Sequence, residues 1–213
     1  MRLVLLGPPA SGKGTQGDVV AAARGIPKIS TGDMLRAARS AGTDLGRQAA
    51  SYMEAGKLVP DDVVIGLVEE RIQQPDAQNG FILDGFPRTE PQADALDQML
   101  RKVQAPLTAV LQIDVPRSLL VERAVLRRID KRTGQIYHLK YSPPPPDAEL
   151  VHRADDQEAT VHKRLDEYDR MTAALLPYYQ TRGLLLRVDG VGSPEQVSER
   201  IKDALAKTST EEA

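Results

Sequence analysis

The segment that most constrains the fold of this chain runs from Gly7 to Thr15 and reads GPPASGKGT. It follows the apolar run Arg2–Leu6, which has the composition of a buried strand, and it leads into the helical pattern of Gly12–Ala23. Glycines allow backbone turns that a Cβ would hinder, and the free amides at a helix N-terminus attract anions. The sequence therefore predicts a phosphate-binding loop whose lysine, Lys13, reaches the outer phosphates of a nucleotide. The alternative interpretation is a glycine turn with a structural role only.

The residue after the lysine departs from the usual form of such loops. Gly14 stands where an ordinary phosphate-loop ATPase has Ser or Thr, and the hydroxyl comes one place later, at Thr15. A magnesium ion that accompanies the nucleotide therefore need not be ligated here as it is in those ATPases.

Short apolar runs alternate with longer helical patterns along most of the chain. Besides the first strand, strands are predicted at 27–29, 81–83, 109–113 and 184–188. Strands separated by helices favour an α/β fold with a parallel sheet covered on both faces. Two stretches fit this rhythm poorly: 30–59 is helical but interrupted by glycines, and 129–154 lacks a long apolar period and contains a run of prolines. Both are predicted to be insertions that move relative to the core, and the alternative is that they are ordinary long loops.

A carboxylate follows the strand predicted at 81–83. In sheets of this kind the C-terminal end of a central strand lies beside the phosphate loop, so Asp84 is a candidate to hold magnesium, through water. A phosphate-loop hydrolase usually has a glutamate beside this position to activate water, and this chain has Gly85 there. That difference argues against ATP hydrolysis as the purpose of the site. In the alternative interpretation, Asp84 caps a turn or a helix.

Arginines gather around both insertions. The set comprises Arg36, Arg88, Arg123, Arg127, Arg128, Arg153 and Arg164. A planar guanidinium donates two parallel hydrogen bonds to a phosphate, so arginine is well suited to bind this anion. Arg123 and Arg127 are four residues apart, so a continuous helix would place them on one face. Each arginine alone is as consistent with a solvated surface position as with a site, but the grouping favours a site.

Composition excludes several other classes of protein. The formal charge is −2, from 28 basic and 30 acidic residues, so we expect no general affinity for nucleic acid or a membrane surface. The chain has no cysteine, which excludes disulfides and cysteine-ligated zinc. The first apolar run ends at Gly7, too soon for a signal peptide or a membrane span, and we expect a soluble, cytoplasmic protein. The pair Asp155-Asp156 is equally consistent with capping a helix that starts near Gln157 and with a role in the site.

Five segments, in order along the chain, resemble the adenylate kinase family. They are Gly7–Thr15, Ile29–Arg36 (ISTGDMLR), Gly56–Val59 (GKLV), Asp84–Arg88 (DGFPR) with Gln92, and Asp155–Glu158 (DDQE). The resemblance implies a P-loop kinase of the α/β class, with a five-stranded parallel sheet flanked by helices. It implies a core of 1–29, 60–125 and 156–213, an AMP-binding insertion at 30–59 and a lid at 126–155. The implied reaction is reversible phosphoryl transfer from Mg-ATP to AMP, giving two ADP, by a monomer whose partners are the nucleotides ATP, AMP and ADP.

The resemblance also implies roles for individual residues. The implied catalytic residues are Lys13, Arg88, Arg127, Arg153 and Arg164. The implied ATP-binding residues are Gly12, Lys13, Gly14, Thr15, Arg123, Arg127 and Arg187. The implied AMP-binding residues are Thr31, Arg36, Lys57, Val59, Gly85, Arg88, Gln92, Arg153 and Arg164. Arg123 would stack on the donor base, Arg187 would offer that base a backbone carbonyl, and Mg²⁺ would come with ATP beside Asp84.

The sequence leaves alternatives open for the structure of the lid and for the choice of substrate. In some relatives four cysteines bind a zinc ion that holds the lid together. This chain has no cysteine, so no structural zinc is expected. The sequence leaves undecided which strands form inside its short, proline-containing lid. Thr31 and Gln92 resemble the AMP-selective pattern, but a kinase of another nucleoside monophosphate, or one that uses GTP as donor, is the nearest alternative. A non-catalytic nucleotide-binding module is a further one. The arginine set argues against that module, because binding alone requires no arginines around the point of transfer.

Overall fold

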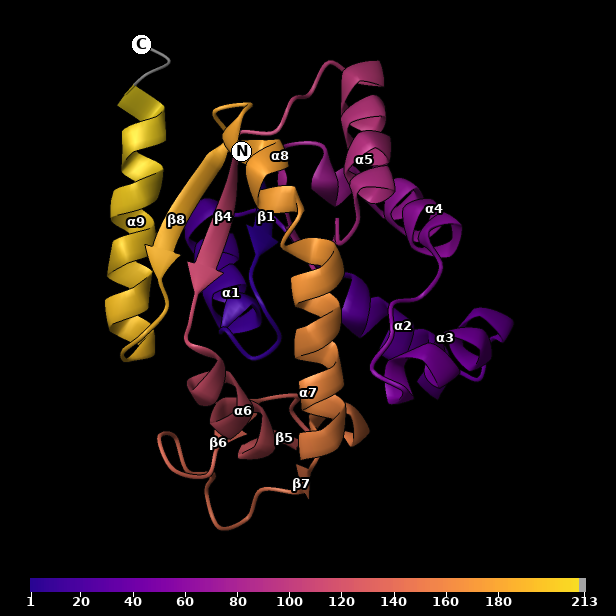
Figure 1. Ribbon diagram of the computed structural model, residues 1–213, viewed down its shortest axis with the longest axis vertical. Helices are drawn as coiled ribbons and strands as arrows, with labels where there is room; N and C mark the ends of the chain where they lie inside the picture. The colour runs from indigo at the N-terminus through magenta and orange to yellow at the C-terminus, as the bar shows by residue number, and fades with distance from the viewer. Residues whose placement is uncertain (211–213) are drawn as a thin grey trace.

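The computed structural model describes residues 1–210; residues 211–213, which the sequence assigned to the core, lie outside the described residues. Its centre is a sheet of five parallel strands in the order β2-β3-β1-β4-β8. Figure 1 labels β1, β4 and β8 of this sheet. They are β1 (Arg2–Leu6), β2 (Lys28–Ser30), β3 (Phe81–Asp84), β4 (Ala109–Asp114) and β8 (Leu185–Asp189). Each bound lies within one residue of its predicted position, so the predicted α/β fold is confirmed.

Alternate residues of the strands contribute to two separate hydrophobic cores. In β1, Val4 and Leu6 belong to one buried cluster, whereas Leu3 and Leu5 belong to the other. Because successive side chains of a strand point to opposite faces of the sheet, the two clusters lie on opposite faces. Burial on both sides explains why these strands are almost continuously apolar.

Helices cover both faces of the sheet and connect its strands. The α-helices are α1 (Lys13–Arg24), α2 (Thr31–Ser40), α3 (Asp44–Glu54), α4 (Asp61–Ile72), α5 (Glu90–Lys102), α6 (Arg117–Val125), α7 (Glu158–Glu167), α8 (Leu175–Gln180) and α9 (Pro194–Thr210). Short 3₁₀ turns lie at Pro75–Ala77 and Ala154–Asp156, and a π-helical turn lies at Tyr168–Thr172. Side chains cap the starts of α2 and α5: the Ser30 hydroxyl accepts from the Asp33 amide, and the Thr89 hydroxyl accepts from the Gln92 amide.

The first insertion consists of α2 and α3, which pack closely against each other. Thr43 caps α3 by accepting a hydrogen bond from the Gly46 amide at 3.1 Å. A Cβ on Gly46 would lie 2.2 Å from the carbonyl carbon of Ala38. Glycine at this position therefore allows the two helices to cross in contact. Beyond α3, Gly56 has a φ of +73°, as expected where a glycine ends a helix.

The second insertion contains a small antiparallel sheet in the order β6-β5-β7. Its strands are β5 (Arg127–Asp130), β6 (Ile136–His138) and β7 (Leu150–Val151). Strands of two to four residues are too short to leave a period in the sequence, which is why their positions stayed open there. The four prolines at 143–146 lie between β6 and β7 and belong to no strand. Figure 1 shows this sheet at the bottom of the view, α2 and α3 at the lower right, and α7 between them.

Within residues 1–210, no helix combines the length and the apolar character that crossing a bilayer demands.

Candidate active site

The loop after β1 lies where the connections of the sheet change direction. Strand β1 pairs with β3 on one side and β4 on the other, and ligands of open α/β sheets bind at the carboxyl ends of strands at such a point. Gly7 and Gly12 have φ values of +148° and +98°, which favour glycine. A Cβ on Gly7 would also lie 2.7 Å from the carbonyl oxygen of Ile113. The path of the loop therefore favours glycine at positions 7 and 12.

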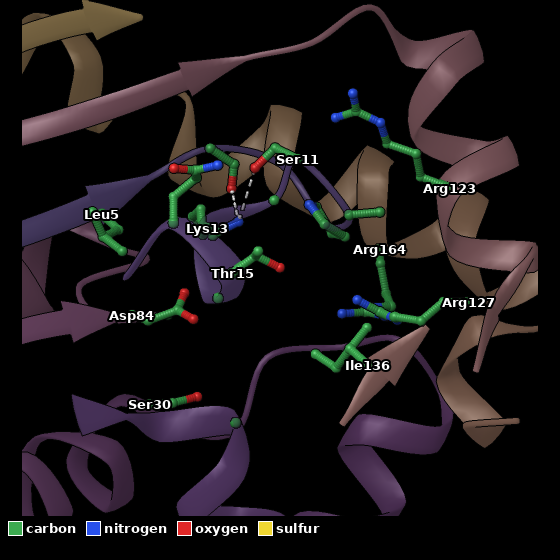
Figure 2. A pocket seen from close by; sticks show the side chains of 18 of the residues that line it. Leu5, Ser11, Lys13, Thr15, Ser30, Asp84, Arg123, Arg127, Ile136 and Arg164 are labelled. Carbon is green, nitrogen blue, oxygen red and sulfur yellow. Dashed lines mark hydrogen bonds between the residues drawn. The ribbon is translucent and has the colours of Figure 1, made fainter. Parts of the chain in front are cut away.

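Lys13 begins α1 and turns its ammonium back toward the loop. Its Nζ donates to the carbonyl oxygens of Gly7 at 2.6 Å and Pro8 at 2.8 Å, and Figure 2 shows the side chain within the pocket. Desolvation lowers the pKa of Lys13 to about 8, a shift that Asp84 opposes and that the positive charge of Arg88 reinforces. Arg164 and Arg127 lower the same pKa further, so these arginines lie within electrostatic reach of the lysine.

One arginine of the second insertion, Arg127, and one of α7, Arg164, share a buried carboxylate. Asp156 is fully buried; it accepts from Arg127 Nε at 2.8 Å and from Arg164 Nη1 at 3.5 Å. Arg164 also pairs with Asp155 at 3.0 Å. Burial alone would lower the pKa of Arg127, but the hydrogen bonds that Arg127 donates to Asp156, and the charge of that carboxylate, raise it. Burial lowers the pKa of Arg164, a shift that the two carboxylates oppose. The ion pairs orient both guanidinium groups, and Figure 2 shows the two arginines in the pocket with the loop.

Arg88 lies on the other side of the loop, after β3. Its Nε donates to the Gly85 carbonyl at 2.9 Å, and its backbone amide donates to Gln92 Oε1 at 2.8 Å. Burial and the charge of Arg164 lower the pKa of Arg88 to about 10, so the group stays charged at neutral pH. The Thr31 hydroxyl donates to the same Gly85 carbonyl at 2.9 Å. Thr31 consequently has only acceptor lone pairs left to offer a ligand.

Two further arginines come from the two insertions. Arg36 on α2 pairs with Asp33 at 2.6 Å. Arg153 precedes the 3₁₀ turn at Ala154–Asp156, and its buried Nε has no hydrogen-bond partner among the described residues. Burial and the charge of Arg36 lower the pKa of Arg153 to about 10. Mutual repulsion between these guanidiniums would be relieved by an anion bound between them.

One cleft of about 970 Å³ brings these groups together, a size that suits nucleotides. Of the residues predicted for the site, those that line it are Gly12, Lys13, Gly14, Thr15, Thr31, Arg36, Lys57, Val59, Asp84, Gly85, Arg88, Gln92, Arg123, Arg127, Arg153 and Arg164. The cleft extends between the two insertions and over the phosphate loop.

Arg187 does not reach this cleft. Its exposed side chain on β8 bonds to Gln180 Oε1 at 2.9 Å, so the prediction that groups it with the ATP-binding residues gains no support from its position. The segment 190–194, just beyond β8, lines the cleft instead, and Arg123 donates to the Gly190 carbonyl at 3.1 Å. A Cβ on Gly190 would lie 2.5 Å from Ile113 Cγ2. The glycines at 190 and 192 mark this close turn in the sequence, but the predicted site did not include the segment.

Two further expectations from the sequence need correction. Helix α6 ends at Val125 and Arg127 opens β5, so Arg123 and Arg127 do not share a helix face. Arg128 turns back to the carbonyl of Val125 at 2.9 Å and does not line the cleft.

The alternatives left open for Asp155-Asp156 are also resolved by their contacts. Helix α7 begins at Glu158 with Gln157 as its N-cap residue, and no side chain caps it. The two aspartates bind arginines instead. These ion pairs orient the guanidinium groups of Arg127 and Arg164.

The oxygen donors near the loop suit magnesium carried by a nucleotide. The Asp84 carboxylate and the Thr15 hydroxyl both line the cleft (Figure 2). Hard cations such as Mg²⁺ prefer these ligands and are usually bound through few carboxylates together with substrate phosphates. Within residues 1–210, no group of three or more His, Cys, Asp or Glu side chains forms a metal cage. The protein groups therefore fit a metal ion that arrives with the phosphates.

A glycine loop at the switch point, a lysine within it and arginines from two insertions define the class: a phosphate-loop phosphotransferase. Comparison with known proteins identifies the family. A family profile described as adenylate kinase matches residues 5–184. An adenylate kinase of Sorangium cellulosum is 57% identical over 210 residues, which cover 97% of each chain. An adenylate kinase of Moorella thermoacetica is 55% identical over 197 residues (89% of this chain and 91% of the relative), and one of Archaeoglobus fulgidus is 49% identical over 214 residues (97% and 99%).

The chain belongs to the adenylate kinase family. It is an enzyme that transfers a phosphoryl group between ATP and AMP, and the predicted activity is confirmed.

The lowered pKa of Lys13 predicts that ATP binding takes up protons in alkaline solution. At pH 9 most Lys13 side chains of the empty cleft are neutral, because their pKa is about 8. Phosphates placed against Lys13 would favour its charged form, so we expect binding of Mg-ATP to raise this pKa and to draw a proton from solvent. At pH 6.5 the lysine is already charged and contributes no uptake. Calorimetry at both pH values, in buffers of different ionisation enthalpy, measures the proton count. A Lys13→Ala variant should lose the extra uptake at pH 9, and equal uptake by both proteins would contradict the assignment.

Proposed function

We propose that the cleft holds ATP and AMP end to end and that Lys13 and the arginines carry the transfer. In this arrangement the triphosphate of ATP lies on the loop against Lys13, and the phosphate of AMP lies against Arg88 and Arg36. The observation that supports it most is the charge distribution: Lys13, Arg88, Arg127 and Arg164 influence one another electrostatically within a single cleft. Binding of one nucleotide alone would not require positive charge both at the phosphate loop and at the acceptor end of the cleft.

The proposed reaction needs little covalent help from the protein. An oxygen of the AMP phosphate attacks the γ-phosphorus of ATP, and the bond from that phosphorus to the β–γ bridging oxygen breaks, so that two ADP form. The attacking oxygen is already anionic, and no general base is needed. Charge spreads over the transferred group in the transition state. Arg127, Arg153 and Arg164 would neutralise this charge in the closed cleft, while Lys13 would hold the donor phosphates.

Magnesium would enter as part of Mg-ATP, with Asp84 holding its water ligands and Thr15 nearby. The ion neutralises phosphate charge and orients the phosphates for attack. Asp84 would position the complex from the end of β3, beside the loop.

We further propose that residues 30–59 act as an AMP-binding insertion and 126–155 as a lid, moving against the core at 1–29, 60–125 and 156–213. Arg36 from one insertion and Arg127 from the other line the same cleft, so closure of both would surround the nucleotides and exclude water. Exclusion of water explains why AMP, not water, accepts the phosphoryl group. The enzyme is proposed to act as a cytoplasmic monomer.

A matrix of donors and acceptors tests the substrate assignment. Purified enzyme is given Mg-ATP or Mg-GTP with AMP, CMP, UMP or GMP, and diphosphate formation is measured. We expect the highest kcat/KM with Mg-ATP and AMP. Faster turnover of another monophosphate, or of GTP as donor, would replace this assignment with that of a different nucleotide kinase. Tight binding without any diphosphate product would favour a non-catalytic module.

Thr31 is proposed to contribute to the choice of AMP. Its buried hydroxyl donates to the Gly85 carbonyl and faces the cleft with acceptor lone pairs. We expect Thr31→Ala to reduce the preference for AMP over CMP and UMP by about fivefold, since a hydrogen bond to a neutral group contributes roughly 1 kcal/mol. The matched control is Thr181→Ala, an exposed threonine at the end of α8. Unchanged discrimination in Thr31→Ala would show that this residue does not select the acceptor.

A further inference from the structure

The backbone of Arg88 is held from both sides. Its amide donates to Gln92 Oε1 at 2.8 Å, and its carbonyl oxygen accepts from the Thr172 hydroxyl at 3.0 Å. The Nε of the side chain donates to the Gly85 carbonyl at 2.9 Å. These three hydrogen bonds fix the position of the Arg88 backbone and the edge of the guanidinium that faces the cleft. Arg88 lines this cleft.

One of these supports is itself fixed by a carboxylate. Gln92 Nε2 donates to Asp61 Oδ1 at 2.7 Å, so the amide oxygen must face the Arg88 amide. The other oxygen of Asp61 accepts from the Thr89 hydroxyl at 2.9 Å. Asp61 is the first residue of α4, directly after the first insertion. The amide side of Arg88 is thus secured by residues at the start of α4 and α5.

The carbonyl side depends on an irregular turn far along the chain. Thr172 lies at the end of the π-helical turn Tyr168–Thr172, in which the Ala173 amide donates to the Tyr168 carbonyl at 2.9 Å. The extra residue of a π turn rotates the side chains that follow relative to a regular helix, and such turns are frequent at functional sites. Here the turn follows α7, the helix that carries Arg164. Thr172 is only 5% exposed, and its hydroxyl reaches Arg88 across 84 positions of sequence.

We propose that Thr172 is a positioning residue for Arg88: the π turn places its hydroxyl on the Arg88 carbonyl, and this bond keeps the guanidinium aimed at the acceptor phosphate. The inference rests on the proposed role of Arg88 toward AMP. Without the hydroxyl, the Arg88 carbonyl loses its donor from this side, and the backbone that carries the guanidinium can shift. A misplaced Arg88 weakens binding of the acceptor nucleotide AMP and slows the transfer step. It leaves the phosphates of the donor, ATP, in place on Lys13.

The test compares Thr172→Val, which removes the hydroxyl at nearly constant volume, with Thr172→Ser, which retains it. In Thr172→Val we expect kcat/KM for AMP to fall about tenfold, because small misplacements at a transfer site cost one to two orders of magnitude. KM for Mg-ATP should change less than about twofold, a split that a merely structural role would not produce. Thr172→Ser should restore most of the activity. The control Thr181→Val removes a comparable hydroxyl bond, to the Pro177 carbonyl, on the exposed end of α8.

A double-mutant cycle links the effect to Arg88. In an Arg88→Ala background, Thr172→Val should cause no further loss in kcat/KM for AMP, since its effect acts through the missing guanidinium. An additive loss, an unchanged Thr172→Val enzyme, equal losses for AMP and Mg-ATP, or failure of Thr172→Ser to rescue would each overturn the inference. If Thr172→Val does not fold, Thr172→Ala replaces it in the same comparison with Thr172→Ser. Near-normal activity of Arg88→Ala alone would instead overturn the proposed role of Arg88, which keeps the two failures distinct.

Discussion

Replacing Lys13 with alanine should lower kcat by about 10³-fold or more while the protein stays folded, by analogy with loss of a preorganised group at a developing charge. Lys13 is the cation of the loop itself, held by the Gly7 and Pro8 carbonyls. Once ATP is present, the phosphates would compete for this ammonium. Its removal takes away charge stabilisation that no neighbouring side chain supplies at the same place. The measurement is steady-state ADP formation at saturating Mg-ATP and AMP, with thermal unfolding followed on the same sample.

The matched control for this variant is Lys202→Ala. Lys202 is exposed on α9 and pairs with Glu199 at 2.7 Å, so its removal should leave both kcat and the unfolding temperature nearly unchanged. Activity of the Lys13→Ala enzyme within tenfold of the parent would show that the transfer does not depend on the loop lysine holding the donor phosphates.

Arg88→Ala is expected to have an effect of similar size on the acceptor side. An arginine that neutralises charge in phosphoryl transfer is worth about 10³–10⁵ in rate. Arg88 stays charged at neutral pH, with a pKa of about 10, and lies within electrostatic reach of both Lys13 and Arg164. We expect a loss of at least about 10³-fold in kcat/KM for AMP, with weaker AMP binding by calorimetry and little change in Mg-ATP binding.

Arg101→Ala provides the comparison, because Arg101 is an exposed arginine near the end of α5, the helix that follows Arg88. It should behave as the parent in every measurement. If Arg88→Ala binds Mg-ATP more weakly and AMP normally, the orientation of the two nucleotides in the cleft is the reverse of the one proposed.

The parts of the fold and site that the sequence predicts are those encoded locally. The phosphate loop is recognisable because glycines, lysine, strand and helix all lie within one short stretch, and the structure requires glycine at Gly7 for close contact with Ile113. The five strands were located because burial on both faces leaves continuous apolar runs.

The parts that the sequence does not predict depend on contacts between distant residues. Asp156 accepts a hydrogen bond from Arg127, which lies 29 positions away in the sequence. The identities of the two residues do not predict that the fold pairs them. Periodicity suggested that Arg127 continues a helix, but the chain leaves α6 at Val125. The same limit applies to Thr172, whose hydroxyl reaches Arg88 only because of a local π turn. Helical spacing alone cannot anticipate such a turn.

The central claim is that AMP, seated beside Arg88, receives the γ-phosphoryl group of ATP in a cleft that excludes water. The most direct test follows a radiolabelled γ-phosphoryl group of ATP in single-turnover reactions with enzyme in excess, with and without AMP. The account predicts that with AMP the label passes between ATP and the β-phosphate of newly formed ADP without appearing as inorganic phosphate, and that without AMP it stays on ATP. Release of the label as inorganic phosphate at a comparable rate, with or without AMP, would contradict the claim.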